Sequence, residues 1–319
     1  MTWWQVLFSA VSAVILFLFS LQSFSHELQE AGGETLRTWL GRVTASRWQG
    51  LLAGAAATAL VQSSSAVTAL AVTLVDAGVI SFKASLGILL GANIGTTTTA
   101  WLVSFKLTDI GPYFIVAGAL VSLLPFRFKF LGKAIFYFGV IFFALNLVSD
   151  KLKPLSDAPV FQEWLGRAEA PWLGVLIGLA FTALVQSSSV TTGLAILLVQ
   201  QGVLPAVAAI PIVVGSNIGT TSTGLIASLG MKPVARATAA ANLFFNAAGV
   251  LIYFPFLRPF SRLMVDWFGA GSMSVAWAHL IFNVTVGLAF LLLLDKVEPM
   301  LSSRFRLGAD SPETKRATA

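Results

Sequence analysis

The chain has 319 residues, of which 56% are hydrophobic and only 11% charged, and its formal net charge is +6. Soluble domains carry roughly 25% charged residues because a surface that faces water needs them, so this composition excludes a soluble globular protein and indicates one integral membrane domain. The chain has no cysteine, which excludes disulfides, thiolate metal sites and cysteine nucleophiles, and its basic residues stand in short gaps between apolar runs, so we expect no nucleic-acid partner.

The first elements are predicted to be a membrane helix, a surface segment and a hairpin. Residues 3–24 form an apolar run without a cleavage site, which predicts a retained transmembrane helix. Residues 26–47 are polar and amphipathic, as in a helix that lies on the membrane surface. The next apolar run is interrupted by Gln62-Ser63-Ser64-Ser65, and its arms, about 50–61 and 66–75, are shorter than the roughly 20 residues that cross a bilayer. This pattern predicts a re-entrant hairpin.

A broken helix is predicted to follow the hairpin. Residues 86–105 are long enough to cross the membrane, but Gly91-Ala-Asn-Ile-Gly-Thr-Thr97 lies at mid-depth. Two glycines and a run of hydroxyl residues favour an interruption of the helix at this point. Residues 112–126 and 133–148 are plainer apolar spans that complete the series.

The same series occurs a second time. Residues 50–104 align without a gap to residues 174–228, at a constant offset of 124 that also separates Gln62 from Gln186, and 29 of the 55 aligned pairs are identical. The second copy repeats both motifs, as Gln186-Ser-Ser-Ser189 and Gly215-Ser-Asn-Ile-Gly-Thr-Thr221, and adds spans at about 237–255 and 274–294. The duplication predicts two structural repeats.

The two repeats are predicted to have opposite orientations. A hairpin returns to its own side and three crossings follow it, so the second hairpin enters from the other face. We therefore expect an all-α polytopic membrane protein with two inverted-topology repeats, each with a re-entrant hairpin and a broken transmembrane helix. Residues 1–301 form one transport domain with repeats at about 26–148 and 150–295, and residues 302–319 form a short basic cytoplasmic tail. Fourteen of the 20 Lys and Arg residues fall on one side, which places the N-terminus outside and the C-terminus in the cytoplasm.

The two motifs suit a pair of ions of opposite charge. Unpaired backbone at membrane depth is tolerated only inside protein or beside a watery cavity. The groups around these breaks are Gln, Asn, Ser, Thr and Gly, with no Lys or Arg. Hydroxyls, amides and helix N-termini donate to an oxyanion, whereas freed carbonyls and side-chain oxygens surround Na⁺. Each ion neutralises the other, so the anion site is poor until the cation arrives.

At this point the sequence resembles the type II sodium–phosphate cotransporter family. The resemblance lies in the paired Gln-Ser-Ser-Ser motifs, each followed by Gly-x-Asn-Ile-Gly-Thr-Thr, and covers about residues 50–246. The chain is similar to bacterial members without a C-terminal regulatory domain. The resemblance implies a secondary transporter in the inner membrane that couples Na⁺ to inorganic phosphate, with Na⁺ as the coupling ion, no cofactor and no enzymatic activity.

The resemblance also implies a set of site residues in both repeats. We expect phosphate to bind at Ser63, Ser64, Ser65, Ser187, Ser188, Ser189, Thr96 and Thr220. We expect Na⁺ to bind at Gln62, Gln186, Asn93, Asn217, Thr97 and Thr221. The expected partners are inorganic phosphate, Na⁺ and the lipid bilayer, together with a second copy of the chain in a homodimer.

Several alternatives stay open. Gly91 and Gly95 also match the small-xxx-small pattern of close helix packing. We expect Asp76 to be a solvated interfacial carboxylate, His279 to be hydrogen-bonded, and Asn242 and Asn246 to bond between helices. The serines invite an intramembrane hydrolase, but neither hairpin contains the activating base that a serine nucleophile needs. An anion channel, or a transporter of sulfate, arsenate or a carboxylate, would use the same groups.

Overall fold

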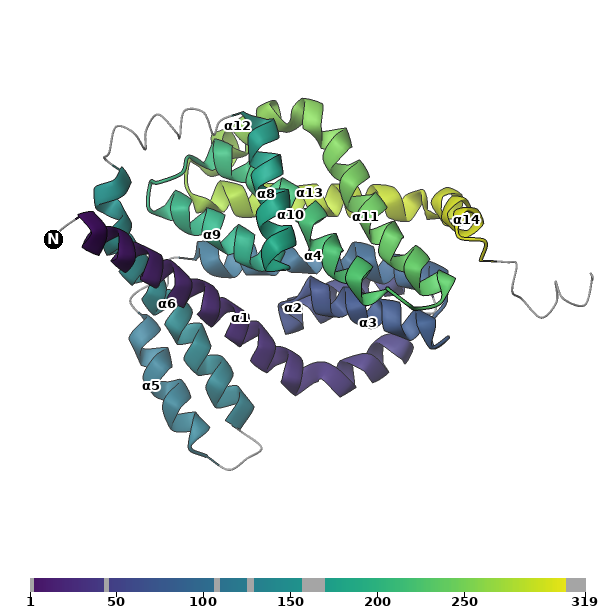
Figure 1. The fold of residues 1–319 in the computed structure, drawn as a ribbon, viewed down its shortest axis with the longest axis horizontal. Coiled ribbons are helices and arrows are strands. Elements are labelled where there is room, and N and C mark those ends of the chain that lie inside the picture. The colour runs from purple at the N-terminus through teal and green to yellow at the C-terminus, as the bar shows by residue number, and fades with distance from the viewer. Residues whose placement is uncertain (1–2, 43–45, 106–109, 125–128, 157–169, 308–319) are drawn as a thin grey trace, which may run out of the picture.

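A computed structural model describes residues 3–42, 46–105, 110–124, 129–156 and 170–307, and every regular element in these ranges is a helix. The helices form an elongated bundle, with the N-terminus near one end and α14 at the other (Figure 1). Among the described residues, six helices are long and apolar enough to cross a membrane. The elements are α1 (Trp3–Arg42), α2 (Arg47–Val61), α3 (Ser64–Asp76), α4 (Phe82–Ser104), α5 (Gly111–Ser122), α6 (Lys129–Ser156), α8 (Pro171–Val185), α9 (Ser188–Gln200), α10 (Ala206–Ala227), α11 (Pro233–Tyr253), the 3-10 turn η3 (Phe254–Phe256), α12 (Leu257–Phe268), α13 (Ser272–Leu292) and α14 (Leu294–Arg304).

The first helix is longer than the sequence predicts. It continues from Trp3 to Arg42, through most of the segment that we expected on the membrane surface. No proline interrupts this stretch. Its last turns pack against the first hairpin, where Leu40 shares a buried cluster with Leu51 and Leu74, and α6 packs along the part before them. The Lys133 ammonium donates to both carboxylate oxygens of the buried Glu27, at 2.9 and 3.2 Å. This ion pair satisfies a charge that would otherwise be costly to bury.

The duplication is present in the helices themselves. The hairpin arms α2 and α3 have the same bounds as α8 and α9 when 124 is added to each number. The helix-tip-helix form predicted at both Gln-Ser-Ser-Ser motifs is therefore confirmed. The four arms have 13 or 15 residues, so none is long enough to cross a bilayer alone.

The predicted breaks in the helices after each hairpin are wrong. Helix α4 runs unbroken through Gly91–Thr97, and α10 runs unbroken through Gly215–Thr221. The glycines serve close packing instead: a Cβ on Gly91 would collide with the carbonyl oxygen of Leu51 on α2. The threonine hydroxyls donate to carbonyls three or four residues earlier in their own helix, which satisfies them without a break.

The two repeats pack crosswise on each other. Within each repeat the first hairpin arm packs along the long helix, α2 on α4 and α8 on α10. The second arm of each hairpin packs on both long helices: α3 contacts α4 and α10, and α9 contacts α10 and α4. Helix α13 packs along α4, and α11 packs on both α10 and α3. These contacts of α3 and α9 with both long helices bring the two hairpin tips to the middle of the bundle.

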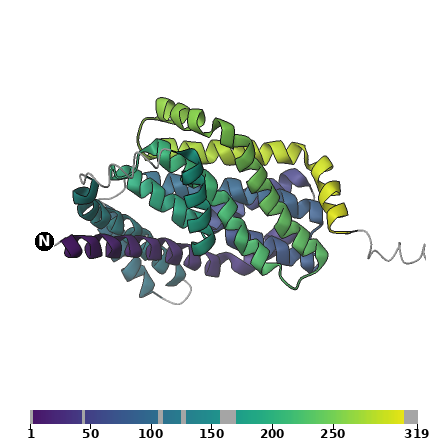
Figure 2. The same ribbon diagram turned by 45° about the horizontal axis from the view of Figure 1, so that its top comes forward.

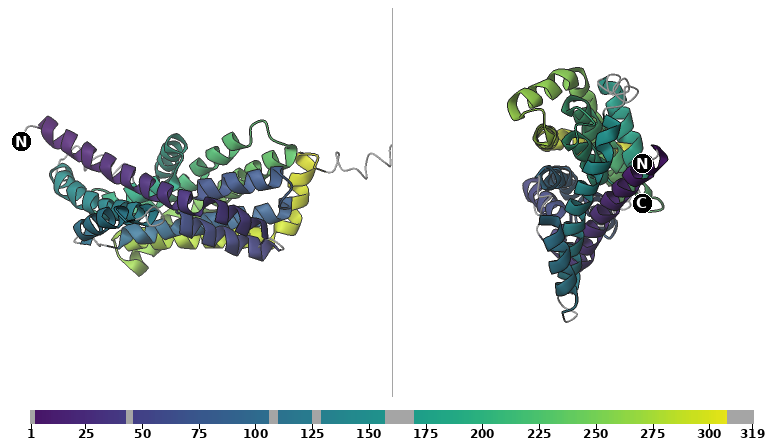
Figure 3. Two further views of the ribbon diagram at one scale, coloured as in Figure 1. Left: turned by 90° about the horizontal axis from the view of Figure 1, so that it is seen from below. Right: turned by 90° about the vertical axis from the view of Figure 1, so that its left-hand side faces the viewer.

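Three elements differ from the predicted spans. Helix α5 has only 12 residues and is too short to cross a bilayer, and with α6 it forms a hairpin that projects from the bundle (Figure 1, Figure 3). Helix α12 was not predicted. It buries Leu257, Ser261 and Met264 and exposes its charged side chains, which is typical of a helix at a membrane interface. Helix α14 includes the start of the predicted tail and turns away from α13 (Figure 2); residues 308–319 lie outside the described residues.

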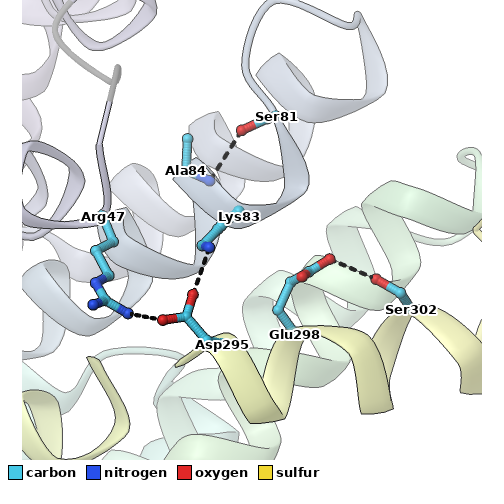
Figure 4. A network of polar contacts seen from close by, with 7 residues as sticks. All are labelled: Arg47, Ser81, Lys83, Ala84, Asp295, Glu298 and Ser302. Atoms are coloured by element: carbon cyan, nitrogen blue, oxygen red, sulfur yellow. Dashed lines mark hydrogen bonds and ion pairs between the residues drawn. The ribbon is translucent and has the colours of Figure 1, made fainter. Parts of the chain in front are cut away.

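An ion-pair network joins α14 to the start of the first repeat. The Asp295 carboxylate accepts from Lys83 Nζ at 2.6 Å and from Arg47 Nη1 at 2.7 Å (Figure 4). The hydrogen bond from Lys83, and then that from Arg47, holds the pKa of Asp295 below its ordinary value. The Asp295 side chain is 58% exposed, so we expect only a small contribution to stability.

The Asp295 network predicts a pH-dependent stability difference. A carboxyl whose pKa is depressed by folding stabilises the fold above its unfolded pKa, and this contribution is lost as the pH falls through the folded pKa. Asp295→Asn is therefore expected to lower the thermal midpoint slightly at neutral pH and to match the wild type in acid. Thermal unfolding in detergent across that pH range measures the difference. Asp266→Asn, on α12, is the control; a difference at Asp295 that persists unchanged into acid contradicts the ion-pair assignment.

Candidate functional site

Each hairpin tip is built around a glutamine in the left-handed backbone conformation. Gln62 has φ 57° and ψ 28°, and Gln186 has φ 57° and ψ 26°. The following serine caps the second arm: Ser63 Oγ accepts from the amide of Ala66, and Ser187 Oγ accepts from the amide of Val190. Glycine adopts this conformation at lower cost, so a glutamine kept at both tips indicates that its side chain is needed.

The two tips contact each other. Ser65 Oγ donates to the backbone carbonyl of Gln186 at 3.2 Å. Thr99 on α4 donates to Gln62 Oε1 at 2.8 Å, and its hydroxyl lies 3.3 Å from that of Ser189. Because the Thr99 proton points to Gln62, Ser189 is the donor in the second contact. One threonine therefore connects the first tip to the second.

A cavity of about 230 Å³, lined by mostly polar residues together with Leu21 and Val190, lies between the tips. Both tips, α4 and α1 contribute to it. Its lining residues are Leu21, Gln22, Ser25, His26, Gln29, Gln62, Ser63, Thr99, Ser187, Ser189 and Val190. The lining contains no Lys, Arg, Asp or Glu, so an ion that enters meets hydroxyls, amides and helix termini only, apart from the imidazole of His26.

The predicted serine and glutamine residues gather at this cavity. Of them, Gln62, Ser63, Ser187 and Ser189 line it, and Ser65 contacts the opposite tip. Ser64 and Ser188 are buried as the first residues of α3 and α9. The Gln186 side chain is exposed, and its backbone carbonyl is the part that meets the other hairpin.

The residues predicted from the Asn-Ile-Gly-Thr-Thr segments do not line the cavity. Thr96, Thr97, Thr220 and Thr221 bond to their own helices. Asn217 does the same, through the carbonyls of Val213 and Val214 at 3.0 and 3.2 Å. Asn93 donates to Asn246 Oδ1 at 3.2 Å, and Asn246 in turn donates to Asn242. The interhelical bonding expected of Asn246 is confirmed, and the ion-binding roles of these side chains stay predictions.

Two further sequence expectations have different outcomes. Asp76, expected to be a solvated interfacial carboxylate, is half-buried at the end of α3, and its carboxylate accepts from the backbone amide of Lys232 at 2.8 Å; its place at a membrane interface stays a prediction. His279 was expected to be hydrogen-bonded, and this is wrong: it is fully buried on α13, and neither ring nitrogen has a hydrogen-bond partner among the described residues.

Sequence reasoning missed two parts of the cavity. Thr99 is identical to Thr223 at the repeat offset, so the duplication could have identified it, but it stands two residues beyond the motif. The wall from α1 lies outside the duplication and has no such signal. Only the folded arrangement places Ser25, His26 and Gln29 beside the tips.

Comparison with known proteins agrees with the duplication. The profile of the Na⁺/Pi-cotransporter family matches residues 16–150 and, a second time, residues 146–293, so each repeat matches it separately. The chain belongs to the Na⁺/Pi-cotransporter family. It is thus a multi-pass membrane protein of a transporter family.

Several members of the family are similar to the chain. It is 33% identical to the uncharacterized protein YqeW of Bacillus subtilis, over 73% of this chain and 77% of that protein. It is 29% identical to the putative inorganic phosphate export protein YjbB of Salmonella typhimurium, over 95% of this chain but 56% of that protein. It is 35% identical to the sodium-dependent phosphate transport protein 2C of Mus musculus, over 59% of this chain and 30% of that protein. The chain therefore spans about half the length of the exporter, and no solved structure matches it.

Proposed function

We propose that the chain is a secondary transporter that couples Na⁺ to inorganic phosphate, and that both ions bind in the cavity between the hairpin tips. The observation that carries the proposal is that both Gln-Ser-Ser-Ser tips, 124 residues apart in sequence, line one small polar cavity without a fixed charge from Lys, Arg, Asp or Glu. Membership of the Na⁺/Pi-cotransporter family and the names of its relatives support phosphate as the cargo.

Each tip offers a positive and a negative pole to the cavity. The first arm ends at the tip and leaves backbone carbonyls, whereas the second arm begins there and leaves amide N–H groups. Phosphate oxygens suit the N-terminal ends of α3 and α9, with the serine hydroxyls beside them. Na⁺ suits the carbonyl ends of α2 and α8, with Gln62 and Gln186 as the side-chain oxygens. Binding of one ion lowers the cost of binding the other, which couples their movement.

The link that Thr99 makes between the two tips has no counterpart among the described contacts of the second repeat. On one side Thr99 joins Gln62 to Ser189. The repeat-equivalent residue on the other side is Thr223, whose buried hydroxyl has no hydrogen-bond partner among the described residues. A buried hydroxyl without a partner is costly, and an arriving ion or a rotated Gln186 side chain would satisfy it. We therefore place the conformational change that accompanies ion binding in the second repeat, around Thr223.

The topology of the proposal follows the loop charges. The proposed orientation has the N-terminus outside and the C-terminus in the cytoplasm of a cell whose inner membrane holds the protein. The inversion of the repeats stays a prediction, because it counts α5 as a crossing and this helix has only 12 residues. Inverted repeats work in either direction, so the ion gradients determine whether phosphate enters or leaves. The export named for the Salmonella relative is consistent with this view.

Radiolabelled phosphate uptake into proteoliposomes tests the proposal. With Na⁺ outside, purified protein is expected to accumulate phosphate above its equilibrium level, and with K⁺ in place of Na⁺ it is not. Arsenate is expected to compete and sulfate is not, because hydroxyls and amides both donate and accept, and phosphate carries an O–H that sulfate lacks. Efflux from phosphate-loaded vesicles under an outward Na⁺ gradient measures the reverse direction.

The same assay separates the alternatives. Saturable uptake of sulfate or a carboxylate in place of phosphate would change the cargo and keep the fold. Flux that only equilibrates phosphate and never accumulates it would indicate a channel. Well-folded protein without Na⁺-dependent uptake in either direction would overturn the coupling.

A further inference from the structure

Helix α1 forms one wall of the cavity, although it precedes the gapless alignment of the two repeats. Leu21, Gln22, Ser25, His26 and Gln29 all face the space between the tips. They occupy successive turns of one helix face, as the spacings of three and four residues require. The gapless alignment of the repeats begins at about residue 50, and the residues that line the cavity include no equivalent wall from the second repeat. The cavity is therefore asymmetric even though its tips are repeats.

A directed chain of hydrogen bonds connects this wall to the first tip. Gln29 Nε2 donates to Ser25 Oγ at 2.9 Å. Ser25 Oγ donates to the carbonyls of Val61 and Gln62, at 3.3 and 3.2 Å. A hydroxyl has one proton, and the donation from Gln29 occupies an acceptor position of Ser25. Gln29 thus directs the Ser25 proton toward the carbonyl end of α2.

The carbonyls that Ser25 reaches belong to the residues that form the left-handed turn. Gln62 has positive φ, a conformation that costs free energy for a residue with a side chain and persists only where its surroundings hold it. Val61 is the last residue of α2, whose final carbonyls have no partner within the helix. Ser25 supplies one of the few side-chain contacts that the structure gives to this backbone.

The second tip receives its equivalent contact from a different place. The Gln186 carbonyl accepts from Ser65, which belongs to the first hairpin. The contacts therefore run in one direction, from Gln29 through Ser25 to the first tip, and from the first tip to the second. A displacement of α1 relative to the hairpins would change both tips together.

We propose that Ser25, oriented by Gln29, is a positioning residue that sets the conformation of the first hairpin tip. Through Ser25, helix α1 contributes to the geometry of the ion site. The inference rests on the proposed function for its effect on transport, but its effect on the tip does not depend on that function. Ser25 itself acts through the Val61 and Gln62 backbone.

Transport kinetics give the first test. Ser25→Ala is expected to raise the KM for phosphate about fivefold to tenfold, the usual effect of losing one hydrogen bond, with little change in the amount of folded protein. Gln29→Ala is expected to have a smaller effect in the same direction. Ser25→Thr keeps the hydroxyl donor and is expected to restore the wild-type KM. Ser20→Ala is the matched control, since Ser20 lies on the same helix, is buried, and bonds only to Leu16 of its own turn.

Thiol labelling of the tip gives the second test and needs no transport. The chain has no cysteine, so Ser63→Cys places one thiol at the cavity. Adding Ser25→Ala is expected to change the rate of labelling by a water-soluble thiol reagent at least about threefold, and adding Ser20→Ala is not. Unchanged labelling and an unchanged KM in Ser25→Ala would overturn the inference. Wild-type protein that shows no Na⁺-dependent phosphate uptake would instead overturn the proposed function, and the labelling result would still decide the role of Ser25.

Discussion

Replacing Gln62 by alanine is expected to reduce Na⁺-coupled phosphate transport to about a hundredth of the wild-type rate or less. The Gln62 side chain donates to the Ala59 carbonyl at 2.6 Å and to Thr98 at 3.0 Å, and it accepts from Thr99. Its amide oxygen keeps one lone pair for a cation, so the substitution removes a proposed ligand and the group that orients Thr99. Uptake into proteoliposomes measures the loss.

A glycine variant keeps this prediction decisive if the alanine variant folds poorly. Gln62→Gly relieves the backbone strain at φ 57°, so it is expected to fold better than Gln62→Ala and still fail to transport. Gln186→Gly tests the equivalent tip and is expected to fail in the same way. Gln49→Ala, at the exposed far end of α2, is the control that keeps transport. Coupled transport at the wild-type rate in Gln62→Gly would remove this side chain from the site.

The sequence predicted the hairpins well because the signal was local and occurred twice. Two apolar arms around Gln-Ser-Ser-Ser can only reverse at the polar residues, and the second copy at Gln186 repeated the same lengths. The bounds of α2 and α3 accordingly agree with the predicted arms within a few residues. That the two tips share one cavity was expected from the family resemblance, and the crosswise packing of α3 and α9 is what brings them together.

The error at Gly91 has a physical origin. A glycine in a membrane helix indicates either a break or a close approach of another backbone, and the sequence pattern is the same for both. In the sequence pattern, the run of threonines that follows favours a break, but in the structure the hydroxyls of Thr96 and Thr97 donate to carbonyls within α4. The residue of this segment that does reach the cavity is Thr99, which lies past the point where the motif ends.

The α1 wall could not be predicted for a different reason. Ser25 and Gln29 lie in an amphipathic stretch whose polar face is equally consistent with a surface helix, which is how the sequence was interpreted. The contacts of Ser25 to residues 61 and 62 cross more than 30 positions and depend on where α6 holds α1, through the pairing of Lys133 with Glu27. Only long-range packing determines that placement.

Replacing Gly91 by alanine is expected to destabilise the protein by about 3 kcal/mol, at the upper end of the usual cost of overpacking. The added Cβ would overlap the Leu51 carbonyl and approach the amide of Ala55, so α4 and α2 would have to separate along their whole contact. Backbone atoms in a packed helix cannot move aside as the end of a side chain can. Thermal unfolding in detergent and the elution profile after purification measure the loss. In the second repeat, the Cβ added by Gly215→Ala would collide with the Val175 carbonyl, and this variant is expected to lose a similar amount of stability.

Gly33→Ala provides the matched control for the Gly91 substitution, and together they separate the two interpretations of Gly91. Gly33 lies inside α1 with no heavy atom within 4 Å of an added Cβ, so alanine there is expected to stabilise the helix by about 0.5–1 kcal/mol. A Gly91→Ala protein that is as stable as the wild type yet does not transport would restore the interpretation of Gly91 as a hinge. A variant that is both stable and active would show that neither close packing nor a break is required at this position. Loss of stability at Gly91, with a gain at Gly33, assigns the glycines of the repeated motif to the contact that holds each hairpin against its long helix, which in turn determines where the two tips meet.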